Sequence, residues 1–226
     1  MPNHKPRRFD ILTIFPEVVA PYAEASILGR AQKGKLIKVV AHNLRDWSTD
    51  KHRKVDDTPY GGGPGMVMKV EPIEKGVKSL RSLKGLRGKK VRVIVTSASG
   101  KPFTQKDAKR LAKYDQLIFI CGRYEGIDAR VEEHVADEAF SIGNYVLTGG
   151  ELPALVMIDA IARNVPGVLG KRESLAEESH GEEGLLEYPQ YTKPEAYKKW
   201  KVPSVLLSGN HAKIEQWRKA KQKTAR

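Results

Sequence analysis

Several features of common protein classes are missing from this sequence of 226 residues. It contains a single cysteine, Cys121, which excludes an intramolecular disulfide framework and is compatible with a reducing compartment. No run approaches the roughly 18 consecutive apolar residues of a membrane-spanning helix. Near the N-terminus, basic residues precede a short apolar run, but Asp10 interrupts it and no cleavage pattern follows, which argues against a signal peptide. We therefore expect a soluble, cytoplasmic protein.

The motifs of several enzyme classes are also missing. There is no G-x-G-x-x-G after the first expected strand and no G-x-x-x-x-G-K-[ST], so the signatures of a Rossmann site and of a P-loop are both absent. The G-x-S-x-G turn of α/β-hydrolases is absent as well. With one cysteine and six scattered histidines, no ligand spacing indicates zinc. The residue spacing predicts no metal site.

Acidic residues are in deficit. Lys and Arg number 40 against 27 Asp and Glu, a net charge of +13. Such an excess favours a polyanionic partner, because cations that neutralise phosphates release condensed counterions; a basic protein without such a partner is the alternative. Residues 188–226 hold ten Lys or Arg and two Glu, 79–92 hold six basic residues and no acid, and 170–187 hold two basic residues and six Glu. This distribution predicts a body (1–169), an acidic linker (170–187) and a basic module (188–226).

Hydrophobic periodicity predicts alternating strands and helices, and hence an α/β domain with a mainly parallel sheet. The expected strands are 9–15, 36–44, 66–70, 90–96 and 116–121. The expected helices are 17–33, one beginning near Pro72, 104–114 with Thr104 as N-cap, 152–165 and 210–223. Residues 45–65 are expected to form a long polar loop. Because parallel sheets bind ligands at the carboxyl ends of their strands, the loops after Thr96 and Cys121 and near Ile142 are the candidates for a site.

Three glycine-rich segments stand out: 60–66 (YGGGPGM), 121–128 (CGRYEGID) and 141–153 (SIGNYVLTGGELP). Glycine allows the backbone to approach a ligand closely. The second segment directly follows an expected strand, and the third runs into an apolar helix whose first N–H groups could face a ligand. A turn without a ligand is the alternative for each segment.

Four long segments resemble the bacterial tRNA (guanine-N1)-methyltransferase family of the SPOUT class: 50–66, 121–128, 141–170 and 184–194. They occur in that family's order, and the resemblance extends over essentially the whole chain. It implies an α/β SPOUT domain with a mainly parallel sheet and a deep trefoil knot, followed by a small helical tRNA-binding domain. It also implies an obligate homodimer with its active site at the subunit interface.

The resemblance further implies that three knot loops clasp S-adenosyl-L-methionine, the methyl donor. Carried over by motif, these loops are 96–100, 122–126 and 142–150. Backbone groups of the second and third loops would hold adenine and ribose, and Glu125 would contact a ribose hydroxyl. The donor-binding residues expected in this way are Ser97, Gly122, Glu125, Gly126, Ile142, Gly143, Asn144, Tyr145, Val146, Leu147, Gly149 and Gly150.

Methyl transfer to guanine N1 requires a base for the N1 proton, a cation or donor for the charge that builds on O6, and alignment with the sulfonium. In the family, an aspartate in the linker acts as the base, and an arginine on the long helix offsets the charge on O6. The arginine maps onto Arg163, which could otherwise be a surface residue at a helix end. Glu178 occupies the position of this aspartate, and its side chain is one methylene longer than that of aspartate. Near Gly184 the linker is one residue longer than in the commoner form of the family. Glu177 and His180 are alternative bases.

The expected substrate is tRNA with guanosine at position 37, 3′ to the anticodon, and with a guanosine before it. Lysines of the basic module would hold its phosphates, whereas Trp200 and Trp217 are expected to form the module's small core. Some family members depend on Mg²⁺, for which the linker carboxylates could serve as ligands. Asp50, His52 and Asp57 are weaker candidates for RNA contact. The alternatives are a SPOUT enzyme acting on ribosomal RNA and a non-catalytic RNA-binding protein.

Overall fold

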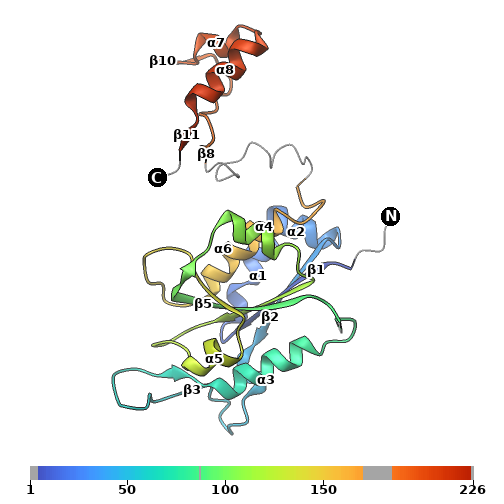
Figure 1. Cartoon of the computed structure of the whole chain (residues 1–226), viewed down its shortest axis with the longest axis vertical. Coiled ribbons are helices and arrows are strands. Elements are labelled where there is room, and N and C mark those ends of the chain that lie inside the picture. Colours follow the sequence, from blue (N-terminus) through green and yellow to red (C-terminus); the bar gives the residue numbers. More distant parts are fainter. Residues whose placement is uncertain (1–4, 87, 170–184, 225–226) are drawn as a thin grey trace. The chain divides into compact units, whose positions relative to one another are not determined.

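The computed structural model describes residues 5–86, 88–169 and 185–224. The chain divides into two compact units, Met1–Gly170 and Lys171–Arg226 (Figure 1). The first unit contains the central sheet and both hydrophobic clusters.

The first unit is built on a five-stranded sheet of order β2-β1-β6-β5-β7, in which every neighbouring pair runs parallel. This confirms the predicted α/β class with a mainly parallel sheet. The strands are β1 (Arg7–Thr13), β2 (Ile37–Asn43), β5 (Val91–Pro102), β6 (Gln116–Cys121) and β7 (Glu138–Ser141).

Helices cover both faces of this sheet (Figure 1). On one face lie α1 (Ala20–Ala23), α2 (Ser26–Lys33), α4 (Gln105–Leu111) and α6 (Glu151–Ala162). On the other lie α3 (Val70–Arg81) and α5 (Ala129–His134). Successive side chains of β6 point to opposite faces of the sheet. Ile118 belongs to the hydrophobic cluster that includes α3, and Phe119 belongs to the cluster that includes α6. Every residue of β6 is buried, as expected for a central parallel strand.

Local signals placed several elements correctly. Thr104 caps α4 by accepting a hydrogen bond from the Asp107 N–H, and Asp107 reciprocates toward the Thr104 N–H. The predicted strand 116–121 coincides with β6. The predicted apolar helix 152–165 corresponds to α6, which begins one residue earlier and ends at Ala162.

The prediction of one continuous helix over 17–33 was wrong. The segment contains a 3₁₀ turn (Pro16–Val18), α1 and α2, with a break at Ser26, whose φ is +46°. The first turn of α2 folds tightly onto the end of α1, because a Cβ on Gly29 would lie 2.0 Å from the Glu24 carbonyl oxygen. Apolar spacing persists through such a break, so periodicity alone does not reveal it.

The segment 45–65 is also more structured than expected. A 3₁₀ helix (Leu44–Trp47) opens it, and β3 (Asp56–Asp57) pairs antiparallel with β4 (Val67–Met68). Strand β5 likewise continues to Pro102, six residues beyond its predicted end, with its register on β7 interrupted between Thr96 and Lys101. Residues 97–100 therefore bulge out of a long strand.

The second unit has short elements. They are β8 (Leu185–Leu186) paired with β11 (Lys223–Thr224), β9 (Ala196–Tyr197) paired with β10 (Trp200–Lys201), α7 (Ser204–Leu207) and α8 (His211–Lys221). None of residues 187–222 is buried. The prediction that Trp200 belongs to a small core was wrong, since it is 71% exposed; Trp217 is half-buried and its ring centroid lies 6.3 Å from that of Tyr191.

Candidate functional site

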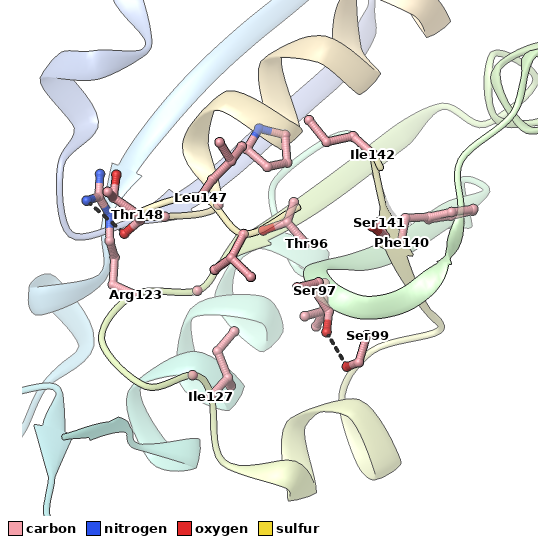
Figure 2. Close-up of a pocket in the computed structure, with 18 of the residues that line it drawn as sticks. Thr96, Ser97, Ser99, Arg123, Ile127, Phe140, Ser141, Ile142, Leu147 and Thr148 are labelled. Carbon is pink, nitrogen blue, oxygen red and sulfur yellow. Dashed lines mark hydrogen bonds between the residues drawn. The ribbon is translucent and has the colours of Figure 1, made fainter. Parts of the chain in front are cut away.

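A pocket of about 400 Å³ opens at the carboxyl ends of β6 and β7, beside the bulge in β5. This volume lies within the range of about 300–1,000 Å³ for small-molecule sites. Its walls are segments 95–99, 122–127 and 140–150 without Asn144, together with Glu132 and Pro153. Figure 2 shows side chains from all three segments around one space. The three loops predicted from the positions of the strands, after Thr96, after Cys121 and near Ile142, therefore meet at one site.

Most residues expected from the resemblance line this pocket. These are Ser97, Gly122, Glu125, Gly126, Ile142, Gly143, Tyr145, Val146, Leu147, Gly149 and Gly150. Asn144 does not line it and is exposed. The third loop turns sharply beside Asn144, where the Tyr145 N–H donates to the Gly143 carbonyl at 3.0 Å.

Gly150 is the point where the pocket segments approach most closely. A Cβ there would lie 2.0 Å from Thr96 Oγ1 and 2.8 Å from both Cys121 Cα and Gly122 N. Its N–H donates to the Gly122 carbonyl at 2.9 Å. Any side chain at position 150 would therefore push the ends of β5 and β6 away from the start of α6.

The first glycine-rich segment borders the second. The Glu125 N–H donates to the Met66 carbonyl at 3.0 Å, and the Met68 N–H donates to the Gly126 carbonyl at 3.0 Å. Gly65 has φ +78°, and a Cβ on it would lie 2.4 Å from Glu125 Cγ. The segments 60–66 and 121–128, which are far apart in the sequence, thus lie together beside the pocket, and Glu125 of the second segment contacts the first.

A buried ion pair lies beside the pocket wall. Glu151, 1% exposed at the first position of α6, accepts hydrogen bonds from Thr13 Oγ1 at 2.6 Å and from Arg123 Nε at 3.0 Å. Arg123 Nη2 completes the ion pair at 2.9 Å from Glu151 Oε2. Arg123 Nη1 donates to the Thr148 carbonyl at 3.2 Å (Figure 2). The guanidinium also lies 4.6 Å from the Phe15 ring centroid. Sequence reasoning missed these side chains, and only the acidic residue directly after Gly149-Gly150 hinted at them.

Cys121 lies at the end of β6 behind the pocket and is fully buried. Burial raises the pKa of its thiol well above the ordinary value, and the Glu151 charge adds to this effect. A protonated, inaccessible thiol is a poor nucleophile. Cysteine chemistry is therefore excluded from this pocket.

Of the residues expected to act on guanine, Arg163 falls within the described ranges, and it does not line the pocket. Arg163 is the half-buried C-cap of α6, at the end opposite Glu151. At about 1.5 Å per helical residue, the two ends of α6 are roughly 18 Å apart. Glu178, the expected base, lies outside the described residues, as do Glu177, His180 and Glu182.

The described residues form neither a metal-binding cluster nor a membrane-spanning helix. Within 5–86, 88–169 and 185–224, no group of three or more His, Cys, Asp or Glu side chains could hold a metal ion. Across the same ranges, no helix is long and apolar enough to span a bilayer.

Comparison with known proteins adds the decisive observation. A family model described as "tRNA (Guanine-1)-methyltransferase TrmD" matches residues 7–226. The chain is 54% identical over 211 residues to a tRNA (guanine-N(1)-)-methyltransferase of Ruminiclostridium cellulolyticum, which covers 93% of this chain and 89% of that protein. It is 55% identical over 212 residues to one of Thermomicrobium roseum, covering 94% and 77%. The chain belongs to this family.

Family membership confirms the resemblance noted in the sequence. A third relative, the tRNA (guanine-N(1)-)-methyltransferase of Syntrophotalea carbinolica, is 52% identical over 215 residues, which cover 95% of this chain and 84% of that protein. The tRNA (guanine-1)-methyltransferase match begins at Arg7, the first residue of β1, and runs through both units. Both the pocket and the basic C-terminal unit therefore belong to the matched region.

Proposed function

We propose that this protein methylates N1 of the guanosine at position 37 of tRNA, 3′ to the anticodon, with S-adenosyl-L-methionine as methyl donor. The family match over residues 7–226 supports the reaction class and the substrate. The observation that carries the proposal is the glycine-lined pocket at the carboxyl ends of the parallel strands β6 and β7 and the bulge of β5 between them, because α/β sheets bind small molecules at the carboxyl ends of their strands.

The pocket has the composition that this donor requires. Ile142, Val146 and Leu147 would give an apolar wall for adenine, and backbone groups of Gly122 and the third loop, which also line the pocket, would hold its polar edge. Because the Tyr145 N–H is donated to Gly143, Tyr145 would contact the donor through its carbonyl or its ring. Glu125 would accept a hydrogen bond from ribose. When bound, S-adenosylmethionine supplies an electrophilic methyl group on its sulfonium.

The residues of this chain would handle the guanine charge and proton. Arg163 would offset negative charge on O6, and Glu178 would accept the N1 proton, each in reach of the base only when it is bound. Arg163 lies at the far end of α6 from the pocket that Pro153 helps to line. We therefore propose that Arg163 and the linker carboxylate serve the pocket of a second subunit.

A face of α6 supports this homodimer. Leu152 and Val156, one turn apart, are 57% and 50% exposed, and Asp159 on the same face accepts a hydrogen bond from Tyr22 of α1. Val18, 37% exposed, precedes α1. Apolar side chains gathered on two adjacent helices are typical of a surface that a second copy covers.

Three finer parts of the proposal follow from family membership. The connections around the pocket would form a trefoil knot, and residues 188–226 would form a small helical domain that holds tRNA through its ten Lys and Arg. Residues 170–187 would be the linker between the two domains. No carboxylate cluster among the described residues fits Mg²⁺, so no step is assigned to that ion.

The test is methyl transfer to a defined transcript. Purified protein with labelled donor should methylate a tRNA transcript that carries guanosine at position 37 and at the position before it. Replacing guanosine 37 with adenosine should abolish the signal. An unchanged signal would refute the assigned target, and labelling of ribosomal RNA in place of tRNA would favour the other SPOUT activity.

A further inference from the structure

Glu151 is a buried carboxylate that the chemistry of methyl transfer does not require. It is 1% exposed and does not line the pocket, so it would not touch the donor. An uncompensated buried charge is costly, and here a two-pronged contact from Arg123 and the Thr13 hydroxyl provide the compensation. The N-terminus of α6 adds a favourable dipole.

Glu151 and its two partners come from three different parts of the chain. Thr13 ends β1, Arg123 belongs to the second pocket loop, and Glu151 itself follows the third loop. Arg123 then extends the connection, because its Nη1 donates to the Thr148 carbonyl within the third loop. One guanidinium thus joins the second loop to both ends of the 148–151 turn.

Two glycines make room for this arrangement. A Cβ on Gly149 would lie 2.2 Å from Arg123 Nε, so the guanidinium lies directly against the backbone of the third loop. The Gly150 N–H donates to the Gly122 carbonyl one residue before Arg123. Loop separation is therefore fixed by one backbone hydrogen bond and one ion pair placed side by side.

We propose that Glu151 is a positioning residue for the donor site: through Arg123 and Thr13 it fixes the separation of the 122–126 and 142–150 loops that would hold S-adenosylmethionine. This inference rests on the proposed function and deepens it. Because Leu147 directly precedes Thr148, the carbonyl that Arg123 holds orients the backbone at the expected adenine contact. Loss of the Glu151 charge should release Arg123 and widen the gap between the two loops.

The chain offers a matched control, Asp10, in the middle of β1. Asp10 is also a fully buried carboxylate, with Arg8 Nε at 2.7 Å and Gln116 Nε2 at 2.8 Å, but its partners do not line the pocket. Loss of either carboxylate should lower the melting temperature. Only the loss of Glu151 should change donor binding, and this difference separates a positioning role from a general contribution to stability.

The experiment measures the Kd of S-adenosylhomocysteine by calorimetry and the melting temperature for full-length wild type, Glu151→Gln, Asp10→Asn, Thr13→Val and Thr13→Ser. Glu151→Gln should weaken binding by about tenfold or more, the loss expected for one charge-assisted hydrogen bond. Thr13→Val should weaken it by about threefold and Thr13→Ser should restore it. In transfer assays the KM for the donor should rise more than the KM for tRNA, and Asp10→Asn should bind like wild type.

Three outcomes would overturn the inference. The first is Glu151→Gln binding as tightly as wild type; the second is Asp10→Asn weakening binding as much as Glu151→Gln. If Glu151→Gln does not fold, the two Thr13 variants provide the test. The third outcome against the inference is then that Thr13→Val and Thr13→Ser bind S-adenosylhomocysteine equally well. A wild-type protein that neither binds the probe nor transfers methyl would remove the proposed function itself, whereas an active wild type with an unaffected Glu151→Gln would remove only this role.

Discussion

The two ends of the central sheet differ in what their polar residues do. At the amino end of β7, Glu138 lies among Arg92 near the start of β5, Lys101 near the end of β5 and Arg110 of α4, with Nη2 of Arg110 at 2.7 Å. These ion pairs join the two strands to α4. At the carboxyl ends, glycines bring backbone segments together and one ion pair lies beside a pocket. The ion pairs of Glu138 stabilise the packing of strands and α4, whereas the Glu151–Arg123 ion pair supports the loops that line the pocket. Stability and ligand binding should therefore be separable by mutation.

The largest expected effect concerns Glu178, the proposed base. Glu178→Gln should lower kcat by about 10²–10⁴, the usual contribution of a positioned proton acceptor. Its Kd for S-adenosylhomocysteine should stay at the wild-type value, because the carboxylate would act on guanine only. Single-turnover methyl transfer measures the first quantity and calorimetry the second. Full activity in this variant would remove Glu178 as the base and leave Glu177 and His180 as candidates.

Gly150→Ala tests the carboxyl end directly. The added methyl would collide with Thr96 and with the β6 backbone, so the loops must separate. We expect donor binding to weaken by about 100-fold and the free energy of unfolding to fall by about 2 kcal/mol, as for an overpacked site. Gly34→Ala is the control, since φ there is −75° and its closest contact would be 3.3 Å. Tight donor binding by Gly150→Ala would contradict the proposed site.

Glu138 tests the amino end through pH. Burial opposes its ionisation, but hydrogen bonds from Arg110, Lys101 and Arg92 lower its pKa from 4.5 to about 2. The stability that this depressed pKa confers is complete above about pH 4.5 and is lost as pH falls toward 2. Urea unfolding of Glu138→Gln should therefore show a smaller acid-induced loss than wild type, while donor binding at neutral pH stays unchanged. Weakened donor binding would contradict the separation of the two ends.

The smallest effect is expected in the second unit. Lys199, exposed between β9 and β10, would make one phosphate contact. Lys199→Ala should weaken tRNA binding by about two- to threefold and reduce the slope of log K against log salt by about 1. Filter binding at several salt concentrations measures both, with Lys33→Ala on α2 as the comparison. An unchanged slope would remove Lys199 from the tRNA surface.

Sequence reasoning succeeded where local patterns decide the structure. The all-apolar run before Cys121 predicted β6, Thr104 was predicted as the N-cap of a helix, and strand positions placed the pocket loops. It failed where no local pattern marks the structure. Apolar spacing did not reveal the break at Ser26, and β3 gained its partner β4 only through folding.

The same limit applies to the candidate site. Thr13 and Glu151 are 138 residues apart in sequence yet share a hydrogen bond, and no periodicity relates them. Arg123 lay inside a segment noted for its glycines, so its side chain received no role until the fold placed Thr148 and Glu151 beside it. Glycine-rich turns could be recognised as ligand loops, whereas the side chains that support them could not.

The burial of Cys121 has a practical consequence for spectroscopy. Because this is the chain's single cysteine and its thiol is both inaccessible and protonated, maleimide dyes should leave the folded protein unmodified. A cysteine introduced on the surface of either unit could then carry a fluorophore or a spin label without background from the native thiol. Movements of the two units could be followed in this way in an otherwise unaltered protein.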